Sequence, residues 1–257
     1  MSVAAFYDGL SADYHLLFAD WDAAITWQSR VLEAVLLPVL GPGPWTVLDA
    51  ACGIGTQALG FAGRGHRVHA SDLSGAAVER LRGEARSRGL TLASVEVADM
   101  RTLAAPAPGG FDAVLVCDNA LPHLLDDAEL ATACVRLRAA LRPGGVLLAT
   151  IRDYDEVLAG RPTGTTVTPV RVIDDASGRR MVYQVWDWGA DGERYAVTQF
   201  VVRGVPGAWT AHGHAGVYRA LRRAVVDVAL RAAGFTAVRW QMPGVSGYYQ
   251  PLVLAQA

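Results

Sequence analysis

The sequence of 257 residues contains no lysine, and all 23 of its basic residues are arginine. This absence excludes chemistry that needs a lysine amine, such as Schiff-base formation, a P-loop phosphate site or a protein-kinase site. The 25 acidic residues leave a formal net charge of −2. Because nucleic-acid binding draws on an excess of positive charge, we expect no nucleic-acid partner.

Cysteine is also scarce, and Cys52, Cys117 and Cys134 are far apart in the sequence. Without a CxxC pair, neither a disulfide framework nor a cysteine zinc site is expected. The N-terminus lacks a basic segment followed by an apolar run, and no apolar run is long enough to span a bilayer. We therefore expect a cytoplasmic protein with no membrane partner. Apolar residues make up 52% of the chain, which is enough for a sizeable core.

Strand and helix patterns alternate through the first part of the chain. The apolar strand patterns lie at 45–50, 67–71, 92–98, 111–117 and 146–151, and the helical patterns between them lie at 53–63, 75–88 and 126–141. This βαβ rhythm predicts an α/β protein with a doubly wound, mostly parallel sheet. Turn-separated β-branched runs at 161–217 predict a small antiparallel insertion. A helix at 218–233 and strands at 237–241 and 248–255 would complete a seven-stranded sheet.

The most informative segment is a glycine loop between the first strand and the first helix of this rhythm. Gly53 and Gly55 let the backbone approach a ligand closely. Asp72 ends the second strand, where a carboxylate can accept the hydroxyls of a ribose. Asp49 ends the first strand, and its charge disfavours the diphosphate of a dinucleotide. The same charge attracts the ammonium and sulfonium groups of S-adenosylmethionine (SAM).

The segment Val47-Leu48-Asp49-Ala50-Ala51-Cys52-Gly53-Ile54-Gly55 resembles motif I of the class I SAM-dependent methyltransferases. The resemblance implies a Rossmann-like fold, SAM as cofactor, S-adenosylhomocysteine (SAH) as product and no metal. In this family the residues after the third strand bracket adenine, which points to Asp99 and Met100 here. Further cofactor contacts are expected from Tyr7, Trp21, Ala51, Leu73 and Cys117.

Two further motifs resemble the glycine and sarcosine N-methyltransferase group. Asn119-Ala120-Leu121-Pro122-His123 follows the fourth strand, and Arg152-Asp153-Tyr154-Asp155 follows the fifth. The resemblance covers residues 45–158 and implies that Asn119 contacts the acceptor and that Arg152 binds an acceptor carboxylate, which a guanidinium matches well. It predicts methylation of an amine nitrogen in an amino acid or a related small molecule.

The insertion departs from that group, because the tyrosines expected there are missing. It offers different acceptor-site candidates, which are Tyr183, Trp186, Trp188, Trp209 and His214. If the aromatic residues face the cleft, the reaction is instead C- or O-methylation of an indole or a phenol. His212 and His214 have no third partner at a fitting spacing, so no metal site is expected. The glycine loop would also suit an NAD-dependent oxidoreductase or a SAM-binding protein without catalytic activity.

Methyl transfer is an in-line displacement, so it needs alignment and a dry cleft more than a nucleophilic residue. The catalytic candidates are His123 or His15, which would take the acceptor's proton, and Tyr14. By the resemblance, residues 1–40 form a helical lid segment, and residues 41–160 and 217–257 form the SAM-binding domain. Residues 161–216 form the insertion that contributes to the acceptor site. The oligomeric state stays open, a homo-oligomer included.

Overall fold

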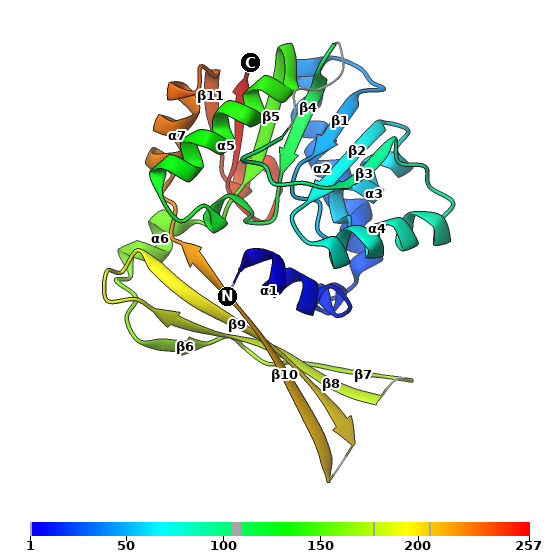
Figure 1. Ribbon diagram of the computed structural model, residues 1–257, viewed down its shortest axis with the longest axis vertical. Helices are drawn as coiled ribbons and strands as arrows, with labels where there is room; N and C mark the ends of the chain where they lie inside the picture. The colour runs from blue at the N-terminus through cyan, green and yellow to red at the C-terminus, as the bar shows by residue number, and fades with distance from the viewer. Residues whose placement is uncertain (1, 104–108, 177, 206) are drawn as a thin grey trace.

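The computed structural model describes residues 2–103, 109–176, 178–205 and 207–257, which form two sheets with flanking helices (Figure 1). The larger sheet has seven strands in the order β11-β12-β5-β4-β1-β2-β3. Its strands are β1 (Thr46–Asp49), β2 (Arg67–Asp72), β3 (Ser94–Val97), β4 (Phe111–Val116), β5 (Leu141–Thr150), β11 (Thr236–Gln241) and β12 (Leu252–Gln256). Only β12 runs antiparallel to its neighbours. The prediction of a doubly wound, seven-stranded sheet is confirmed.

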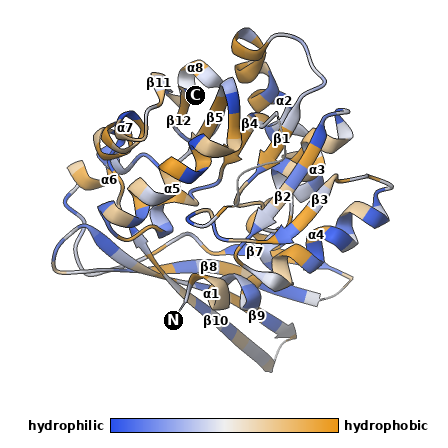
Figure 2. Ribbon diagram, turned by 45° about the horizontal axis from the view of Figure 1, so that its top comes forward, coloured by the Kyte–Doolittle hydropathy of each residue, from blue (hydrophilic) through white to orange (hydrophobic). Residues whose placement is uncertain are grey.

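Both faces of this sheet are buried, because the apolar residues of its strands alternate between two cores. Along β4, Ala113 and Leu115 belong to one core, and Val114 and Val116 belong to the other. Helices α2 (Trp21–Leu40), α3 (Thr56–Gly63) and α4 (Gly75–Ser87) cover the first face, and α5 (Asp127–Ala140) and α7 (Arg223–Ala232) cover the second. Figure 2 shows the hydrophobic residues gathered in these central strands. The continuous apolar runs of the sequence therefore reflect burial on two sides.

Several helices begin at side chains that cap their free backbone N–H groups. Asp20 accepts from Ala23 at the start of α2, and Ser74 accepts from Ala77 at the start of α4. Gly41, at φ +75°, ends α2. Among the described helices, α2 is the one long and apolar enough to span a membrane by length and composition. Here its apolar side chains pack in the first core with those of α3.

The second sheet is antiparallel. Its strands are β6 (Thr165–Val167), β7 (Arg171–Asp175), β8 (Gly178–Trp188), β9 (Arg194–Val205) and β10 (Ala208–Arg219). The predicted helix from residue 218 starts too early, because Tyr218 pairs with Tyr195 in the sheet and α7 begins only at Arg223. The first helix, α1 (Val3–Leu10), lies between this sheet and the carboxyl ends of the parallel strands (Figure 1).

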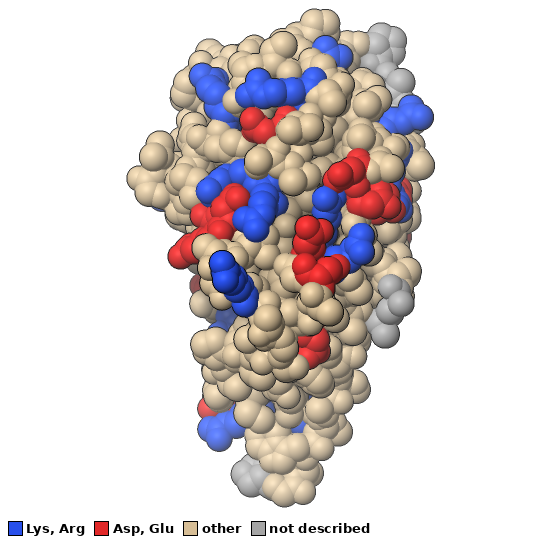
Figure 3. Space-filling view, turned by 90° about the vertical axis from the view of Figure 1, so that its left-hand side faces the viewer, with Lys and Arg blue, Asp and Glu red and all other residues tan. Residues whose placement is uncertain are grey.

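Short helices complete the connections between these elements. They are η1 (Tyr14–Leu17), η2 (Leu121–His123), α6 (Tyr154–Ala159) and α8 (Pro243–Ser246). Basic and acidic side chains are interspersed on the face that carries α6 and α7 (Figure 3). There Arg223 at the start of α7 pairs with Asp153 and Asp155, which precede and begin α6.

Candidate active site

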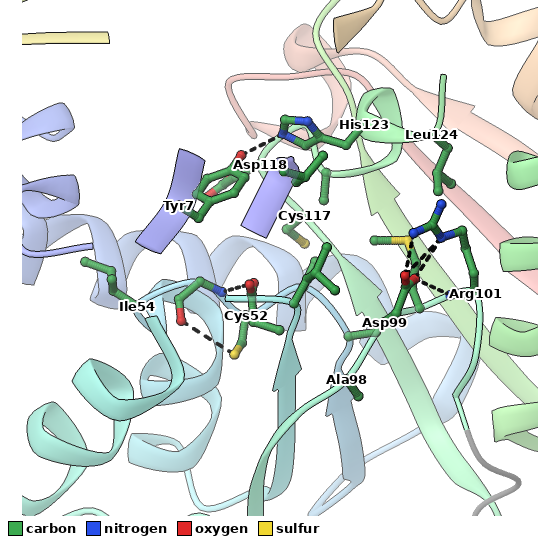
Figure 4. A pocket seen from close by; sticks show the side chains of 18 of the residues that line it. Tyr7, Cys52, Ile54, Ala98, Asp99, Arg101, Cys117, Asp118, His123 and Leu124 are labelled. Atoms are coloured by element: carbon green, nitrogen blue, oxygen red, sulfur yellow. Dashed lines mark hydrogen bonds and ion pairs between the residues drawn. The ribbon is translucent and has the colours of Figure 1, made fainter. Parts of the chain in front are cut away.

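Two adjoining cavities open at the carboxyl ends of the parallel strands, the edge where open α/β sheets bind ligands. The first cavity is shown in Figure 4. Many residues predicted for the cofactor or for catalysis line it, namely Tyr7, Tyr14, Ala51, Gly53, Asp72, Leu73, Asp99, Met100, Cys117 and His123. They come from α1, η1 and the ends of β1 to β4, so the topology brings together residues that are far apart in the sequence.

The two loop glycines have different roles. Gly53 has φ +51° and open space where a Cβ would stand, so it leaves the first cavity accessible. Gly55 has φ +103°, and a Cβ there would overlap the Leu81 side chain. Gly55 does not line the cavity; it permits helix α4 to pack against the loop. The structure therefore gives no support to the cofactor contact predicted for Gly55 and shows that this glycine is needed for packing.

Asp72 holds the glycine loop and also faces the first cavity. Its Oδ2 accepts from the backbone N–H of Gly53 and its Oδ1 from that of Ser74, both at 2.8 Å. Burial raises the pKa of Asp72. A carboxylate can accept about four hydrogen bonds, so Asp72 keeps capacity for a ribose hydroxyl.

Asp49 lies behind the loop and has no exposed surface. The backbone amides of Ala51 and Ala58 are near, but neither carboxylate oxygen has a partner at hydrogen-bonding distance. Burial, followed by the charges of Asp72 and Asp118, raises the pKa of Asp49 to about 8. Asp49 does not line the cavity, so its predicted attraction for a cationic cofactor would act from behind the loop.

Asp99 and Arg101 form the end of the first cavity opposite Tyr7 (Figure 4). Arg101 Nε lies 3.0 Å from each carboxylate oxygen of Asp99, and its guanidinium also pairs with Glu129. Burial alone would raise the pKa of Asp99, but the hydrogen bonds from Arg101 lower it below the ordinary value. The Arg101 backbone N–H and Nη2 also donate to Asp99, so both carboxylate oxygens are engaged within the protein, and Met100 lies beside them in the cavity wall.

His123 is a neutral histidine whose two ring nitrogens are both engaged. Its Nδ1 lies 3.3 Å from the carbonyl oxygen of Val217, which can only accept, so Nδ1 carries the proton. Its Nε2 then accepts from the Tyr7 hydroxyl at 2.8 Å. Burial lowers the pKa of His123 to about 4. Any proton passed to His123 from the acceptor would have to travel through Tyr7.

The N-terminal segment is fastened over the first cavity. Asp8 accepts from the Ser74 hydroxyl at 2.6 Å, and Arg80 donates to the carbonyl oxygens of Ser11 and Ala12. Trp21 is buried and donates to the Thr56 hydroxyl at 2.9 Å.

Two candidates from this segment lie away from the cavities. Trp21 anchors the segment and lines neither cavity, so the structure gives no support to its predicted cofactor contact. His15 lines neither cavity either, which removes it as a candidate base in this arrangement. Burial lowers the pKa of His15, and the charge of Arg80 adds to the effect.

The second cavity contains Arg152, a side chain without a carboxylate partner among the described ion pairs. Its Nη1 donates to the Tyr195 hydroxyl at 2.8 Å, and its guanidinium lies 4.2 Å from the ring centre of Trp186. The neighbouring Asp153 and Asp155 are bound by Arg223 instead. Arg152 is thus a partly buried cation that lines the second cavity without a carboxylate partner among the described ion pairs.

Asn119 lines the second cavity, yet its amide is occupied by protein partners. Its Oδ1 accepts from the backbone N–H of Arg152 at 3.0 Å, and its Nδ2 donates to the Tyr154 hydroxyl at 2.9 Å. The Tyr154 hydroxyl lies 2.7 Å from that of Tyr195. This network orients Arg152, so Asn119 acts on the site chiefly by positioning.

The aromatic and histidine candidates of the insertion do not line either cavity. Tyr183 stacks on Phe200, Trp186 lies beneath Arg152, and His214 packs against Gly9 of α1. Trp188 is buried in a core, and Trp209 is 42% exposed. The insertion contributes other residues to the second cavity, namely Gln184, Gln199 and Tyr218.

Asp118 is a site residue that sequence reasoning missed. It lines both cavities and follows directly after β4 and Cys117. Its position next to Asn119, at the carboxyl end of a central strand, was the signal that could have found it.

The described residues of the first cavity fit SAM. Asp72 and Asp118 line this cavity and take part in none of the described ion pairs, so a cationic ligand would meet two carboxylates without a basic partner among the described residues. Gly53 leaves room for it where any larger side chain would intrude.

Comparison with known proteins agrees with this geometry. Residues 47–145 match a methyltransferase domain family. The chain is 30% identical over 155 residues to the glycine/sarcosine N-methyltransferase of Halorhodospira halochloris, covering 59% of this chain and 58% of that protein. It is 33% identical over 162 residues to rat (Rattus norvegicus) glycine N-methyltransferase, covering 55% of each. The match therefore spans little more than half the length of these relatives.

Among solved structures, the CcbJ methyltransferase of Streptomyces caelestis superimposes with a TM-score of 0.77 at 17% identity, covering 99% of this chain and 98% of that one. This likeness concerns the fold alone. The domain match over residues 47–145, motif I and the seven-stranded sheet make the chain similar to the class I SAM-dependent methyltransferases, and over a little more than half of its length to their glycine/sarcosine N-methyltransferase group.

Proposed function

We propose that the protein transfers the methyl group of SAM to the nitrogen of a small-molecule amine that also bears a carboxylate, such as an amino acid. The observation that carries this proposal is Arg152, a partly buried guanidinium without a carboxylate partner among the described ion pairs, in a cavity that adjoins the cofactor cavity. A guanidinium binds a carboxylate through two parallel hydrogen bonds, which fixes the orientation of the acceptor.

SAM supplies a methyl group bonded to a positively charged sulfur. Asp72 and the Gly53 loop would hold the cofactor, while Tyr7 and Tyr14, which line both cavities, flank the point where the two ligands meet. Alignment of two bound reactants can contribute about 7–11 kcal/mol to the lowering of a barrier. Residues of the N-terminal segment line both cavities and are fastened to α4, so we propose that residues 1–40 serve as the lid.

His123 is proposed as a positioning residue. Because its Nε2 is occupied, it fixes the Tyr7 hydroxyl at the junction of the cavities and does not meet the acceptor directly. Tyr218, whose hydroxyl lies 3.3 Å from that of Tyr7, helps to hold the same group.

A second candidate is C- or O-methylation of an aromatic acceptor, which the wall of the second cavity favours. That wall includes Phe6, Phe18, Trp27 and Tyr249. The same wall would also suit an amino acid with an aromatic side chain, so the two candidates differ mainly in the need for Arg152.

The test is incubation of the protein with SAM and a panel of amino acids, amines, indoles and phenols, followed by measurement of SAH. We expect SAH with carboxylate-bearing amines, and a large loss of this activity in Arg152→Met. SAH formation with indoles or phenols that Arg152→Met leaves unchanged would favour the second candidate. Binding of SAM without SAH formation from any panel member would refute both and leave a non-catalytic SAM-binding protein.

A further inference from the structure

Asp118 lies where the two cavities meet. Of the described residues only Tyr7, Tyr14 and Asp118 line both of them, and Asp118 is the one charged residue of the three. In Figure 4 it stands beside Tyr7 and His123, away from the adenine end marked by Asp99. A molecule held in the second cavity must present its reacting atom at this junction to reach a ligand in the first.

The carboxylate of Asp118 is held from three sides and keeps one free position. Its Oδ1 accepts from the hydroxyls of Tyr248 at 2.7 Å and Tyr249 at 2.6 Å. Its Oδ2 accepts from Gln57 Nε2 at 2.9 Å. Because a carboxylate offers about four acceptor positions, one on Oδ2 remains for a donor that enters the cavity.

No arginine neutralises Asp118 in the described part of the chain, although many of the other carboxylates have such a partner. The second cavity is lined by two charged residues, Asp118 and Arg152, and they are not paired with each other. A site with one free anion and one free cation is complementary to a zwitterion. Its volume of about 400 Å³ is within the roughly 300–1,000 Å³ typical of small-molecule sites.

The backbone at Asp118 is in a conformation that glycine adopts without cost. Asp118 has φ +54° and Asn119 has φ +70°, and aspartate and asparagine tolerate this left-handed region better than other non-glycine residues do. Thr150 holds the turn, since its hydroxyl accepts from the Asp118 N–H at 2.8 Å and its carbonyl from the Asn119 N–H at 3.2 Å. This turn fixes the Asp118 carboxylate where it faces both cavities.

Resting on the proposed methyl transfer, we infer that Asp118 is a catalytic residue that binds the acceptor's amino group, with the acceptor an amino acid larger than glycine. Its free Oδ2 position accepts an N–H of the amine and turns the nitrogen lone pair toward the methyl group. As the N–C bond forms, the C–S bond breaks and its electron pair stays on sulfur. Positive charge then moves from sulfur to nitrogen, where the carboxylate stabilises it. The proton that an ammonium acceptor loses before attack goes to solvent.

The test compares two acceptor-like probes that differ only in the group Asp118 would bind. L-phenylalanine and L-3-phenyllactate share a carboxylate for Arg152 and a ring for the aromatic wall, and they differ in ammonium against hydroxyl. Their affinities are measured by calorimetry on protein saturated with SAH, whose neutral sulfur removes the sulfonium charge from the comparison. We expect the wild type to bind phenylalanine at least about tenfold more tightly, as a charge-assisted hydrogen bond requires.

Three variants make the result specific. Asp118→Asn should reduce the preference for phenylalanine to about one. Asp118→Gly removes the carboxylate and relieves the backbone strain, so it serves if the asparagine variant folds poorly. Asp112→Asn removes the same charge at the other end of β4 and should keep the preference.

The inference is overturned if the wild type shows no preference, or if the preference survives in both Asp118 variants. It is also overturned if these variants change only the affinity for SAM relative to SAH, because the carboxylate would then serve the sulfonium. If no amine yields SAH but the preference depends on Asp118, the binding role stands and the proposed methyl transfer fails instead.

Discussion

Asp49→Asn should remove a pH dependence of stability that comes from a single buried carboxyl group. Asp49 has no exposed surface and no hydrogen-bond partner among the described residues, and burial raises its pKa from 3.8 to about 8. Between these two values the folded chain keeps a proton that the unfolded chain has lost. Stability must therefore fall as the pH rises from about 4 to about 8, and level off above that range.

The size of this effect follows from the shift. A difference of about 4 pKa units corresponds to at most roughly 5 kcal/mol of folding free energy, lost in full above pH 8. For a chain of this length a few kcal/mol corresponds to a change in Tm on the order of 10 °C. The asparagine side chain does not ionise, so its contribution does not change over the same range.

The assay is thermal unfolding of ligand-free wild type and Asp49→Asn at intervals from pH 5 to pH 9. We expect the Tm of the variant, relative to the wild type, to rise steadily with pH. The affinity of the wild type for SAM should increase as the pH rises through 8, because a cation binds more tightly near ionised Asp49. The affinity for SAH, which lacks the sulfonium charge, should increase much less. If the Tm difference between the two proteins does not change with pH, Asp49 is ionised throughout this range and burial does not raise its pKa.

Three further predictions concern the site. Arg152→Met should weaken binding of carboxylate-bearing acceptors about 10²-fold while leaving SAH affinity within about twofold, as calorimetry can measure; equal losses for carboxylate-free amines would contradict the assigned role. Because burial lowers the pKa of His123 to about 4, the wild-type rate should show no histidine inflection between about pH 5.5 and 8. If His123 acts only through Tyr7, the double variant Tyr7→Phe/His123→Ala should be no slower than Tyr7→Phe alone. Additive losses of rate in the double variant would show that the two residues act independently. Gly55→Ala should lower Tm by on the order of 5–10 °C through overlap with Leu81 and backbone strain, whereas Gly53→Ala, which adds strain without overlap, should lower Tm less and weaken SAH binding; a reversed pattern would refute the two glycine roles.

The main sheet could be predicted because its strands are buried on both faces and leave a strong pattern. The run at β4 is apolar at every position from Ala113 to Val116, and the glycine loop marks where β1 gives way to α3. The boundary at Tyr218 was missed because aromatic residues suit a strand and a helix alike. Its pairing with Tyr195 decided the outcome, and such a cross-strand partner is fixed by the register of two strands, which no local pattern records.

The cofactor cavity was also accessible from sequence, since its residues follow the ends of consecutive strands. The second cavity was accessible only in part: Asn119 and Arg152 were predicted for the acceptor, but the remaining wall comes largely from the insertion and the N-terminal segment, whose relative placement no local pattern records. Tyr183 and Trp186 lie on strand β8, and only the registry of that strand decides which side chains reach a cavity. Asp118 was overlooked because its importance depends on both cavities meeting at one turn.

The placement of the two chain ends has a practical consequence for recombinant production. Ser2 and Val3 line the first cavity, so an affinity tag fused ahead of them would emerge at its rim and obstruct the entrance. Ala257 is bonded to Gly144 and Gly145 near the start of β5, at the opposite end of the sheet (Figure 1). An affinity tag is therefore better placed at the C-terminus. Slow turnover of an N-terminally tagged preparation should first be checked against an untagged or C-terminally tagged one.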